Sequence, residues 1–142
     1  MKKLIILLPF MLICSVAYSL SENCKDTAQN KCATPYGEVL GESDGVVAYS
    51  NCRSECVNPE SNNISGKAFS ANKEVFTGLK WQCVEFARRW WITKFGITFG
   101  SVDTANEIFD LKNAENLKSK QKIKLRKENN YSSIAPKVGD LI

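Results

Sequence analysis

The chain has 142 residues, of which 44% are hydrophobic and 24% are charged, and its formal net charge is +4 at pH 7. This length suits one domain rather than two, and this composition excludes a chain that is disordered throughout. If residues 1–19 are removed during export, 17 basic residues face 15 acidic ones, and a net charge of +2 is too weak to indicate a nucleic-acid partner.

The N-terminus has the layout of a secretory signal peptide. Two lysines precede an apolar run over residues 4–16, and Ala17 and Ser19 are the small residues that a cut after Ser19 requires. The run is too short to span a bilayer comfortably and no later segment is suitable, so we expect no stable membrane anchor. The sequence therefore predicts a signal peptide over 1–19 and a secreted or periplasmic mature chain.

Export also determines how the cysteines are interpreted. Five of the six cysteines lie beyond residue 19, and an oxidising compartment allows four of them to pair. Four cysteines have three connectivities, and the sequence does not select among them. Because short loops close easily, we favour Cys24–Cys32 with Cys52–Cys56, which ties down an N-terminal arm over 20–34. Zinc on Cys52 and Cys56 is the alternative, but the chain has no histidine and no second tight pair, so we expect no metal or other cofactor.

Short strands are predicted in the first half of the mature chain. Turn signals, the clearest at Asp44-Gly45, separate Val39-Leu40 from Val46–Tyr49, and both apolar runs are typical of strands. Residues 52–66 contain Pro59 and a Ser-Asn-Asn cluster, which favour a loop.

A central helix is predicted to begin near Cys83 and to end at Gly96. Apolar residues fall on two of its faces, which indicates packing on most sides. Glu85 with Arg88 and Arg89 gives i,i+3 and i,i+4 pairs on the remaining face. A second helix is predicted from about residue 104, where Thr-Ala-Asn-Glu matches a capping box.

The C-terminal third is less regular. The basic stretch over 118–127 is predicted to be a solvated loop or an edge strand with Ile123 and Leu125 as its buried side chains. The alternative is a surface that attracts an anionic polymer such as a bacterial wall. Residues 136–142 are predicted to form a turn that opens a strand. Because the sequence stops where that strand begins, we expect it to be a fragment.

Cys83 is the candidate nucleophile, because it is the cysteine that stays a free thiol when the other four cysteines of the mature chain pair. Its position at a helix N-terminus favours the thiolate form. Acyl transfer by a thiol also needs a base and hydrogen-bond donors for the oxyanion. The helix end and the Gln82 amide are candidate donors, but the chain has no histidine and an acid alone is a poor base for a thiol.

The segment from Gly78 to Trp91 reads Gly-Leu-Lys-Trp-Gln-Cys-Val-Glu-Phe-Ala-Arg-Arg-Trp-Trp. It resembles the amidase domain of bifunctional glutathionylspermidine synthetase/amidase, which belongs to the CHAP family of cysteine, histidine-dependent amidohydrolases/peptidases. The likeness covers residues 35–142 apart from the basic stretch. It implies an α+β, papain-like fold with N-terminal helices and an antiparallel sheet that is incomplete here, so that 35–142 forms a CHAP-like domain.

The resemblance also implies roles for individual residues. Cys83 matches the nucleophile of the family, Gln82 an oxyanion donor, and Arg88 a residue linked to substrate binding. The histidine of the family and the acid that orients it match nothing up to Ile142. Trp81 is close enough to Cys83 to wall a substrate cleft, although core packing is the ordinary role of such a residue.

These observations predict a secreted cysteine amidohydrolase or peptidase that cleaves an amide or peptide bond through an acyl-enzyme on Cys83. Peptidoglycan peptides are the leading substrate and partner, and a glutathionylspermidine-like amide is the second. Without the histidine, the chain itself is expected to be nearly inactive. Two alternatives stay open. One is a secreted binding module that kept the cleft and lost the base, and the other is a small disulfide-tied structural protein with Cys83 merely buried.

Overall fold

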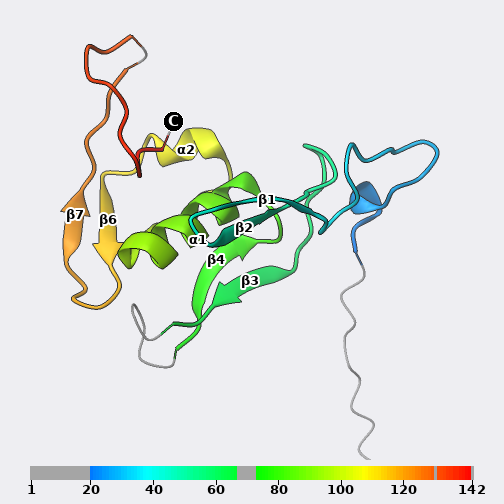
Figure 1. Ribbon diagram of the computed structural model, residues 1–142, viewed down its shortest axis with the longest axis horizontal. Helices are drawn as coiled ribbons and strands as arrows, with labels where there is room; N and C mark the ends of the chain where they lie inside the picture. Colours follow the sequence, from blue (N-terminus) through cyan, green and yellow to red (C-terminus); the bar gives the residue numbers. More distant parts are fainter. Residues whose placement is uncertain (1–19, 67–72, 130, 142) are drawn as a thin grey trace, which may run out of the picture.

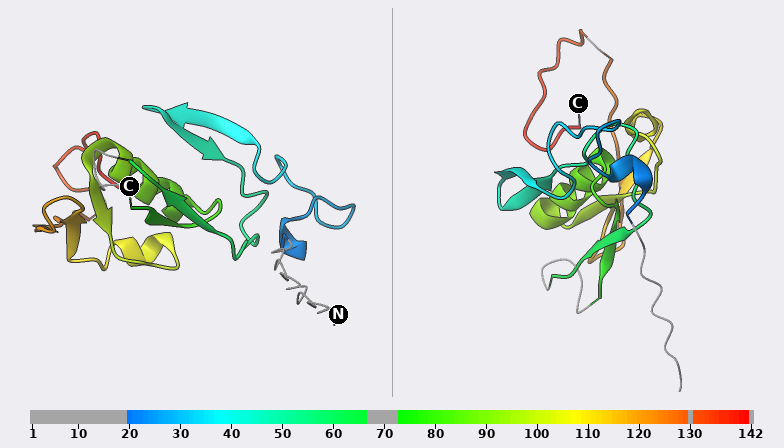
Figure 2. Two further views of the ribbon diagram at one scale, coloured as in Figure 1. Left: turned by 90° about the horizontal axis from the view of Figure 1, so that it is seen from below. Right: turned by 90° about the vertical axis from the view of Figure 1, so that its right-hand side faces the viewer.

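The computed structural model describes residues 20–66, 73–129 and 131–141, so the predicted signal peptide over 1–19 lies outside the described residues. Figure 1 shows helix α1 (Cys83–Phe95) at the centre with small antiparallel sheets around it. An arm that contains the short 3-10 helix η1 (Glu22–Cys24) projects at one end, as the left view in Figure 2 also shows.

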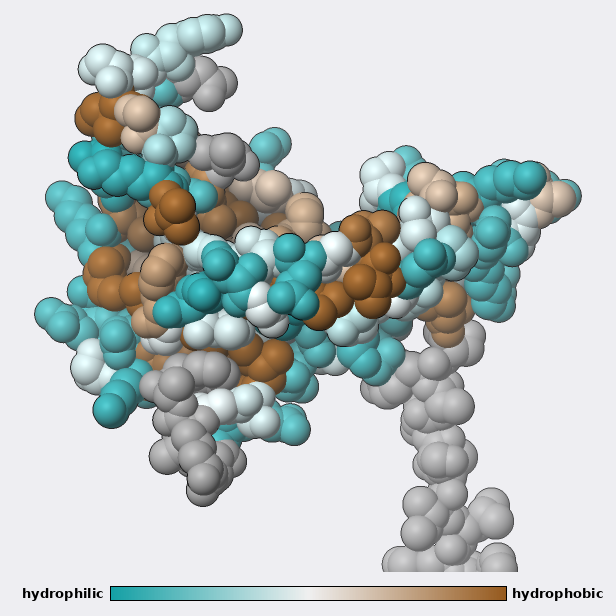
Figure 3. All heavy atoms as spheres, viewed as in Figure 1, coloured by the Kyte–Doolittle hydropathy of each residue, from teal (hydrophilic) through white to brown (hydrophobic). Residues whose placement is uncertain are grey.

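The two short strands predicted before residue 50 are confirmed, and the structure shows that they form a hairpin. Strand β1 (Val39–Ser43) pairs antiparallel with β2 (Val46–Tyr49). The connecting residues Asp44 and Gly45 have φ of 53° and 82°, which is the backbone shape that a tight hairpin turn requires. Every residue of β1 is exposed, and Figure 3 shows apolar side chains on the surface over this strand.

A second strand pair was not predicted. Strand β3 (Ser61–Ile64) pairs with β4 (Val75–Leu79), so the loop prediction for 52–66 is wrong at its C-terminal end. The Ser-Asn-Asn sequence has a low intrinsic preference for strands. Pairing with β4 overrides that preference, and Thr77 Oγ1 adds a 3.1 Å hydrogen bond to the Asn62 carbonyl.

The third sheet has the order β5-β6-β7 and is built from β5 (Ile97–Phe99), β6 (Asn113–Asn116) and β7 (Lys122–Lys124). Strand β7 lies at the edge of this sheet, so the basic stretch over 118–127 is an edge strand at Lys122–Lys124 and turn or loop on either side. Its lysines are exposed while Ile123 is half-buried opposite Ala114, as alternation on an edge strand requires.

The second predicted helix is present but short. Helix α2 (Ala105–Ile108) is one turn long, and its N-cap Thr104 makes no side-chain bond to a backbone N–H. The Glu107 carboxylate instead accepts from the Asp103 N–H at 2.9 Å and from the Thr104 hydroxyl at 3.3 Å. The reciprocal hydrogen bonds of a capping box are therefore absent at this turn.

Helix α1 has the central position that the sequence predicts, since it contacts β2, β4 and β5. It ends at Gly96, whose left-handed φ of 64° places its N–H 2.9 Å from the Ile92 carbonyl. Ile92 is fully buried, but the buried face of α1 also contains Glu85, Arg88 and Arg89. Three charged residues of this helix therefore lie inside the structure, while Lys94 in its last turn is exposed.

The residues after 136 form the predicted turn, closed by the hydrogen bond from the Asp140 N–H to the Lys137 carbonyl. The Trp91 indole donates to the Gly139 carbonyl at 2.8 Å and fixes this turn on α1. No strand follows within the described residues, and Ile142 lies outside them.

The disulfides differ from the predicted pairing. Cys24 bonds to Cys56 and Cys32 bonds to Cys52, so the predicted Cys24–Cys32 and Cys52–Cys56 bridges are wrong. The entropy of loop closure rises only slowly with loop length, and the advantage of the shorter loops is therefore small. Packing decides instead, because Cys24, Cys52 and Cys56 meet in one buried cluster between the arm and the segment before β3. Since Cys52 and Cys56 are disulfide-bonded, neither supplies a thiolate to zinc.

The described residues thus form a mixed α and β structure with two α-helices and small antiparallel sheets. The papain-like architecture and the division of the chain at residues 19 and 34 stay predictions.

Gly78, in β4, provides a test of this packing. Its φ is 146°, and an added Cβ would lie 2.9 Å from the Glu85 Cβ. We expect Gly78→Ala to lower the free energy of unfolding by at least about 2 kcal/mol, because it adds both backbone strain and a clash with a buried helix residue. Gly41→Ala in β1 is the matched control, since no atom lies within 4 Å of its added Cβ. Urea denaturation measures both, and equal losses in the two variants would contradict this account.

Candidate active site

Cys83 is the first residue of α1, and its side chain is exposed. It is the free cysteine of the described residues, the other four being bonded in disulfides. The chain approaches it through an extended N-cap, Gln82, whose N–H donates to the Leu79 carbonyl at 3.0 Å. An exposed thiol is inconsistent with the alternative in which Cys83 is merely a buried structural residue.

Cys83 opens into a cleft of about 590 Å³ between the start of α1, the β1–β2 hairpin and the disulfide-tied segment that follows β2. Aromatic side chains, two arginines and one carboxylate share this cleft with the thiol. Its lining residues are Ala33, Thr34, Leu40, Ala48, Tyr49, Ser50, Asn51, Cys52, Arg53, Ser54, Trp81, Gln82, Cys83, Glu85, Phe86 and Arg89.

Trp81 lies among the lining residues, as the sequence suggests, and is half-buried. Its ring packs on Tyr49 of β2 with the centroids 4.2 Å apart and the planes tilted by 33°. Aromatic pairs at this separation are stabilised beyond the area that they bury. A direct contact of Trp81 with substrate stays a prediction.

The Gln82 amide points into the disulfide-tied segment. Its Nε2 donates to the Cys56 carbonyl at 2.8 Å and lies 3.5 Å from Asn51 Oδ1. An oxyanion donor has to aim at the reacting carbonyl oxygen. The predicted donor role of Gln82 therefore requires its amide to leave the Cys56 carbonyl when substrate binds, and it stays a prediction.

Glu85 is the carboxylate of the cleft, and it is only 1% exposed. Its Oε1 accepts three hydrogen bonds: from Asn62 Nδ2 at 2.8 Å, from Thr77 Oγ1 at 2.8 Å and from Arg89 Nε at 2.7 Å. Its Oε2 accepts from Arg89 Nη2 at 3.2 Å. Both oxygens are therefore engaged, which satisfies the buried charge and leaves the carboxylate poorly suited to take a proton from Cys83.

Arg89 connects this carboxylate to the hairpin. Its Nη1 donates to the Val47 carbonyl in β2 at 2.8 Å, and its guanidinium lies 5.7 Å from the Tyr49 ring centroid and 5.9 Å from that of Trp81. The aromatic wall of the cleft thus rests on the Glu85–Arg89 ion pair.

Arg88 lies outside the lining of the cleft and is 3% exposed. Its guanidinium donates to three backbone carbonyls, those of Thr77, Phe99 and Gly100, at 2.7 to 3.2 Å. Burial lowers the pKa of Arg88, and the nearby Glu85 carboxylate partly offsets that effect. The geometry shows a role in joining β4 to β5, while the predicted role in substrate binding stays untested.

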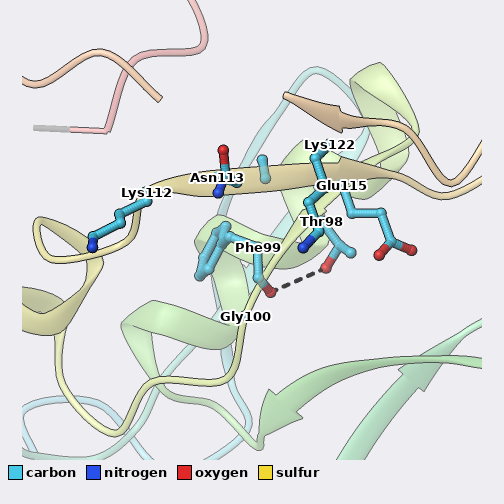
Figure 4. A pocket seen from close by; sticks show the side chains of 8 residues that line it. Thr98, Phe99, Gly100, Lys112, Asn113, Glu115 and Lys122 are labelled. Atoms are coloured by element: carbon cyan, nitrogen blue, oxygen red, sulfur yellow. Dashed lines mark hydrogen bonds between the residues drawn. The ribbon is translucent and has the colours of Figure 1, made fainter. Parts of the chain in front are cut away.

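A second hollow, of about 370 Å³, lies over β5 and β6 and is drawn in Figure 4. Two lysines and Glu115 surround it, but it has no cysteine, and the Thr98 hydroxyl is directed to the Phe99 carbonyl at 3.4 Å. Within the described part of the chain, no group of three or more histidine, cysteine or acidic residues is placed to hold a metal ion.

The structure adds residues that the sequence did not single out. Asn62 and Thr77 come from strands that were not predicted, so their convergence on Glu85 had no signal in the sequence. The Glu85–Arg89 pair did have a signal in the sequence, namely its i,i+4 spacing. Spacing alone does not distinguish a buried ion pair from a solvated one.

No family model matches the chain. Similar proteins are trypanothione synthetase of Crithidia fasciculata, 35% identical over 109 residues, and the bifunctional glutathionylspermidine synthetase/amidases of Escherichia coli (strain K12) and Shigella flexneri, each 32% identical over 108 residues. The matches cover 76% of this chain but only 16% and 17% of those proteins. The chain is thus homologous to these enzymes and spans about a sixth of their length. A continuous stretch of 108 residues in a chain of 142 starts at residue 35 or earlier and ends at residue 108 or later. The homologous stretch therefore includes Cys83 and all of α1.

The buried ion pair of the cleft supports a quantitative prediction. We expect Glu85→Gln to lower the free energy of unfolding by about 3 kcal/mol or more, because Arg89 is then buried without its carboxylate. Glu115→Gln is the control, since the Glu115–Lys120 pair is exposed and its loss costs less than about 1 kcal/mol. Chemical denaturation followed by circular dichroism compares the two. A loss in Glu85→Gln as small as that in Glu115→Gln would show that the network contributes little.

Proposed function

We propose that this chain, a homologue of the glutathionylspermidine synthetase/amidases, carries the nucleophile of a thiol amidase. The observation that carries the proposal is the position of Cys83, which is exposed, free of any disulfide and placed at the first residue of α1 in the cleft. The homologous stretch includes this residue. The word amidase in the names of two relatives favours hydrolysis of a C–N bond.

In the proposed reaction, the Cys83 sulfur forms a bond to the carbonyl carbon of an amide. The first turn of α1 offers backbone N–H groups without partners inside the helix, and these stabilise the developing oxyanion. Collapse of the intermediate breaks the C–N bond and leaves a thioester on Cys83 while the amine takes up a proton. Water then hydrolyses the thioester and restores the thiol.

The proton of Cys83 needs an acceptor, and the sequence contains no histidine. Glu85 shares the cleft, but its oxygens are occupied by Asn62, Thr77 and Arg89. We therefore propose that full activity requires a base other than these cleft residues, and that the 142 residues alone form the acyl-enzyme far faster than they turn over.

The substrate class follows from location and from homology. The two disulfides are compatible with an extracellular location, and in the described residues no helix is long and apolar enough to cross a membrane. We propose a secreted or periplasmic protein with peptide amides of the bacterial wall as the first substrate to test. The name of the relatives makes glutathionylspermidine the second.

The missing imidazole favours one other candidate, a secreted module that binds the same amides in the cleft without cleaving them. The two candidates differ in a measurable way. A binding module forms a saturable complex with a wall peptide and no covalent adduct, whereas a thiol amidase forms an adduct on Cys83.

We therefore expect an activated ester, N-acetylglycine p-nitrophenyl ester, to acylate Cys83 in the folded chain at least about tenfold faster than in the urea-unfolded chain. An activated ester is the right probe because its leaving group departs without help from a general acid. Mass spectrometry of the intact chain and of its peptides locates the acetylglycyl group.

Cys83→Ala is the control and should acquire no acyl group in the α1 peptide, while Glu115→Gln should behave as the parent chain. Acylation of Cys83 no faster than in the unfolded chain would remove the amidase proposal and leave the binding module.

A further inference from the structure

The disulfide-tied segment over 51–56 forms a wall of the cleft. Asn51, Cys52, Arg53 and Ser54 line it together with Cys83. The disulfides hold this wall at Cys52 and Cys56. The Cys56 carbonyl also accepts the 2.8 Å hydrogen bond from Gln82, the residue immediately before the nucleophile. The wall is therefore fixed in position relative to Cys83.

Arg53 is held within this wall by its backbone and by its side chain. Its N–H donates to the Asn51 carbonyl at 2.7 Å, and its own carbonyl accepts from the Cys56 N–H and from Asn51 Nδ2, each at 3.1 Å. Its Nη2 donates to the Asn23 carbonyl in η1 at 2.7 Å. A side chain held in this way loses less conformational entropy when it binds a ligand.

The charged residues that line the cleft do not balance one another. Three lining residues are charged: Glu85, Arg89 and Arg53. Glu85 and Arg89 neutralise each other through hydrogen bonds of 2.7 and 3.2 Å. The ion pairs found among the described residues do not include Arg53. The pKa of the neighbouring Glu55 is lowered by its hydrogen bond from Ser54 and also by the charge of Arg53, but Glu55 is not among the lining residues. Arg53 therefore gives the lining its net positive charge.

We propose that Arg53 is a specificity-determining residue that selects acyl groups carrying a carboxylate. A guanidinium presents a planar fork of five N–H donors, and the hydrogen bond to Asn23 engages one of them, so a bidentate contact with a carboxylate stays available. The inference rests on the proposed function, because it assigns the substrate class of the same cleft. Lysine would keep the charge of Arg53 but lose the fork.

Alkylation of Cys83 tests this charge without any need for turnover. Iodoacetate and iodoacetamide both form a thioether on the Cys83 sulfur and release iodide, but only iodoacetate carries a carboxylate. The measured quantity is the ratio of the two labelling rates at Cys83, mapped by peptide mass spectrometry under non-reducing conditions. The same ratio in the urea-unfolded chain is the reference.

We expect Arg53→Gln to lower this ratio about threefold or more, and Arg53→Lys to keep it within about twofold, since only the first removes a unit of charge from the cleft that contains Cys83. Raising the ionic strength should lower the ratio of the parent chain toward that of Arg53→Gln. Arg126→Gln is the matched control, because Arg126 follows β7 at the opposite end of the molecule from the arm and should leave the ratio unchanged. An Arg53→Gln ratio equal to that of the parent chain would overturn the proposal.

A pair of acyl donors then tests the recognition of the carboxylate itself. The p-nitrophenyl esters of succinic acid and of succinamic acid have the same length, and only the first is anionic. We expect Arg53→Gln to slow acylation of Cys83 by the succinic ester several-fold and to leave the succinamic ester unaffected. Equal slowing of both esters would overturn the role of Arg53 in specificity. Failure of both esters to acylate the parent chain would instead count against the proposed function, while the alkylation ratio still decides the charge assignment.

Discussion

One buried carboxylate organises this structure. Glu85 is almost completely removed from solvent, and an unpaired charge in that place would be strongly destabilising. Its hydrogen bonds reach Asn62 in β3, Thr77 in β4 and Arg89 one turn further along α1, and Arg89 continues to β2. Strand pairs that share no backbone hydrogen bonds with each other are thereby joined through the helix. The same network lies beside Cys83, so the packing of the sheets and the position of the thiol depend on the same contacts.

The disulfide-tied segment gives the cleft a second fixed side. The Cys56 carbonyl receives hydrogen bonds from both Gln82 and Asn51, and the Cys52 N–H donates to Ser50 Oγ at 3.0 Å. These contacts fix a polar, cross-linked wall in the cleft that the aromatic pair of Tyr49 and Trp81 also lines. A ligand in the cleft would therefore meet both aromatic side chains and polar groups, the combination that is common in small-molecule sites.

The sequence was most informative where local rules and structure agree. The helix from Cys83 to Gly96 and the turn at Asp44-Gly45 were predictable because a thiol at a helix start, a left-handed C-terminal glycine and an Asp-Gly hairpin each depend on nearby residues. Strands β3 and β4 and the disulfide pairing were not predictable, because both depend on long-range packing that local propensity does not report. Cys83 could be identified as a candidate in advance, whereas the burial of Glu85 and the position of Arg53 beside the cleft needed the structure.

The nested arrangement of the two disulfides has a consequence for proteolysis. Cys24–Cys56 encloses Cys32–Cys52, and the exposed Asp44-Gly45 turn lies inside both loops. A protease that cuts the backbone at this turn therefore cannot release either half, because two covalent links still join the arm to the segment next to α1. The hairpin can be nicked, as exposed loop tips often are, while the two pieces stay attached around the thiol.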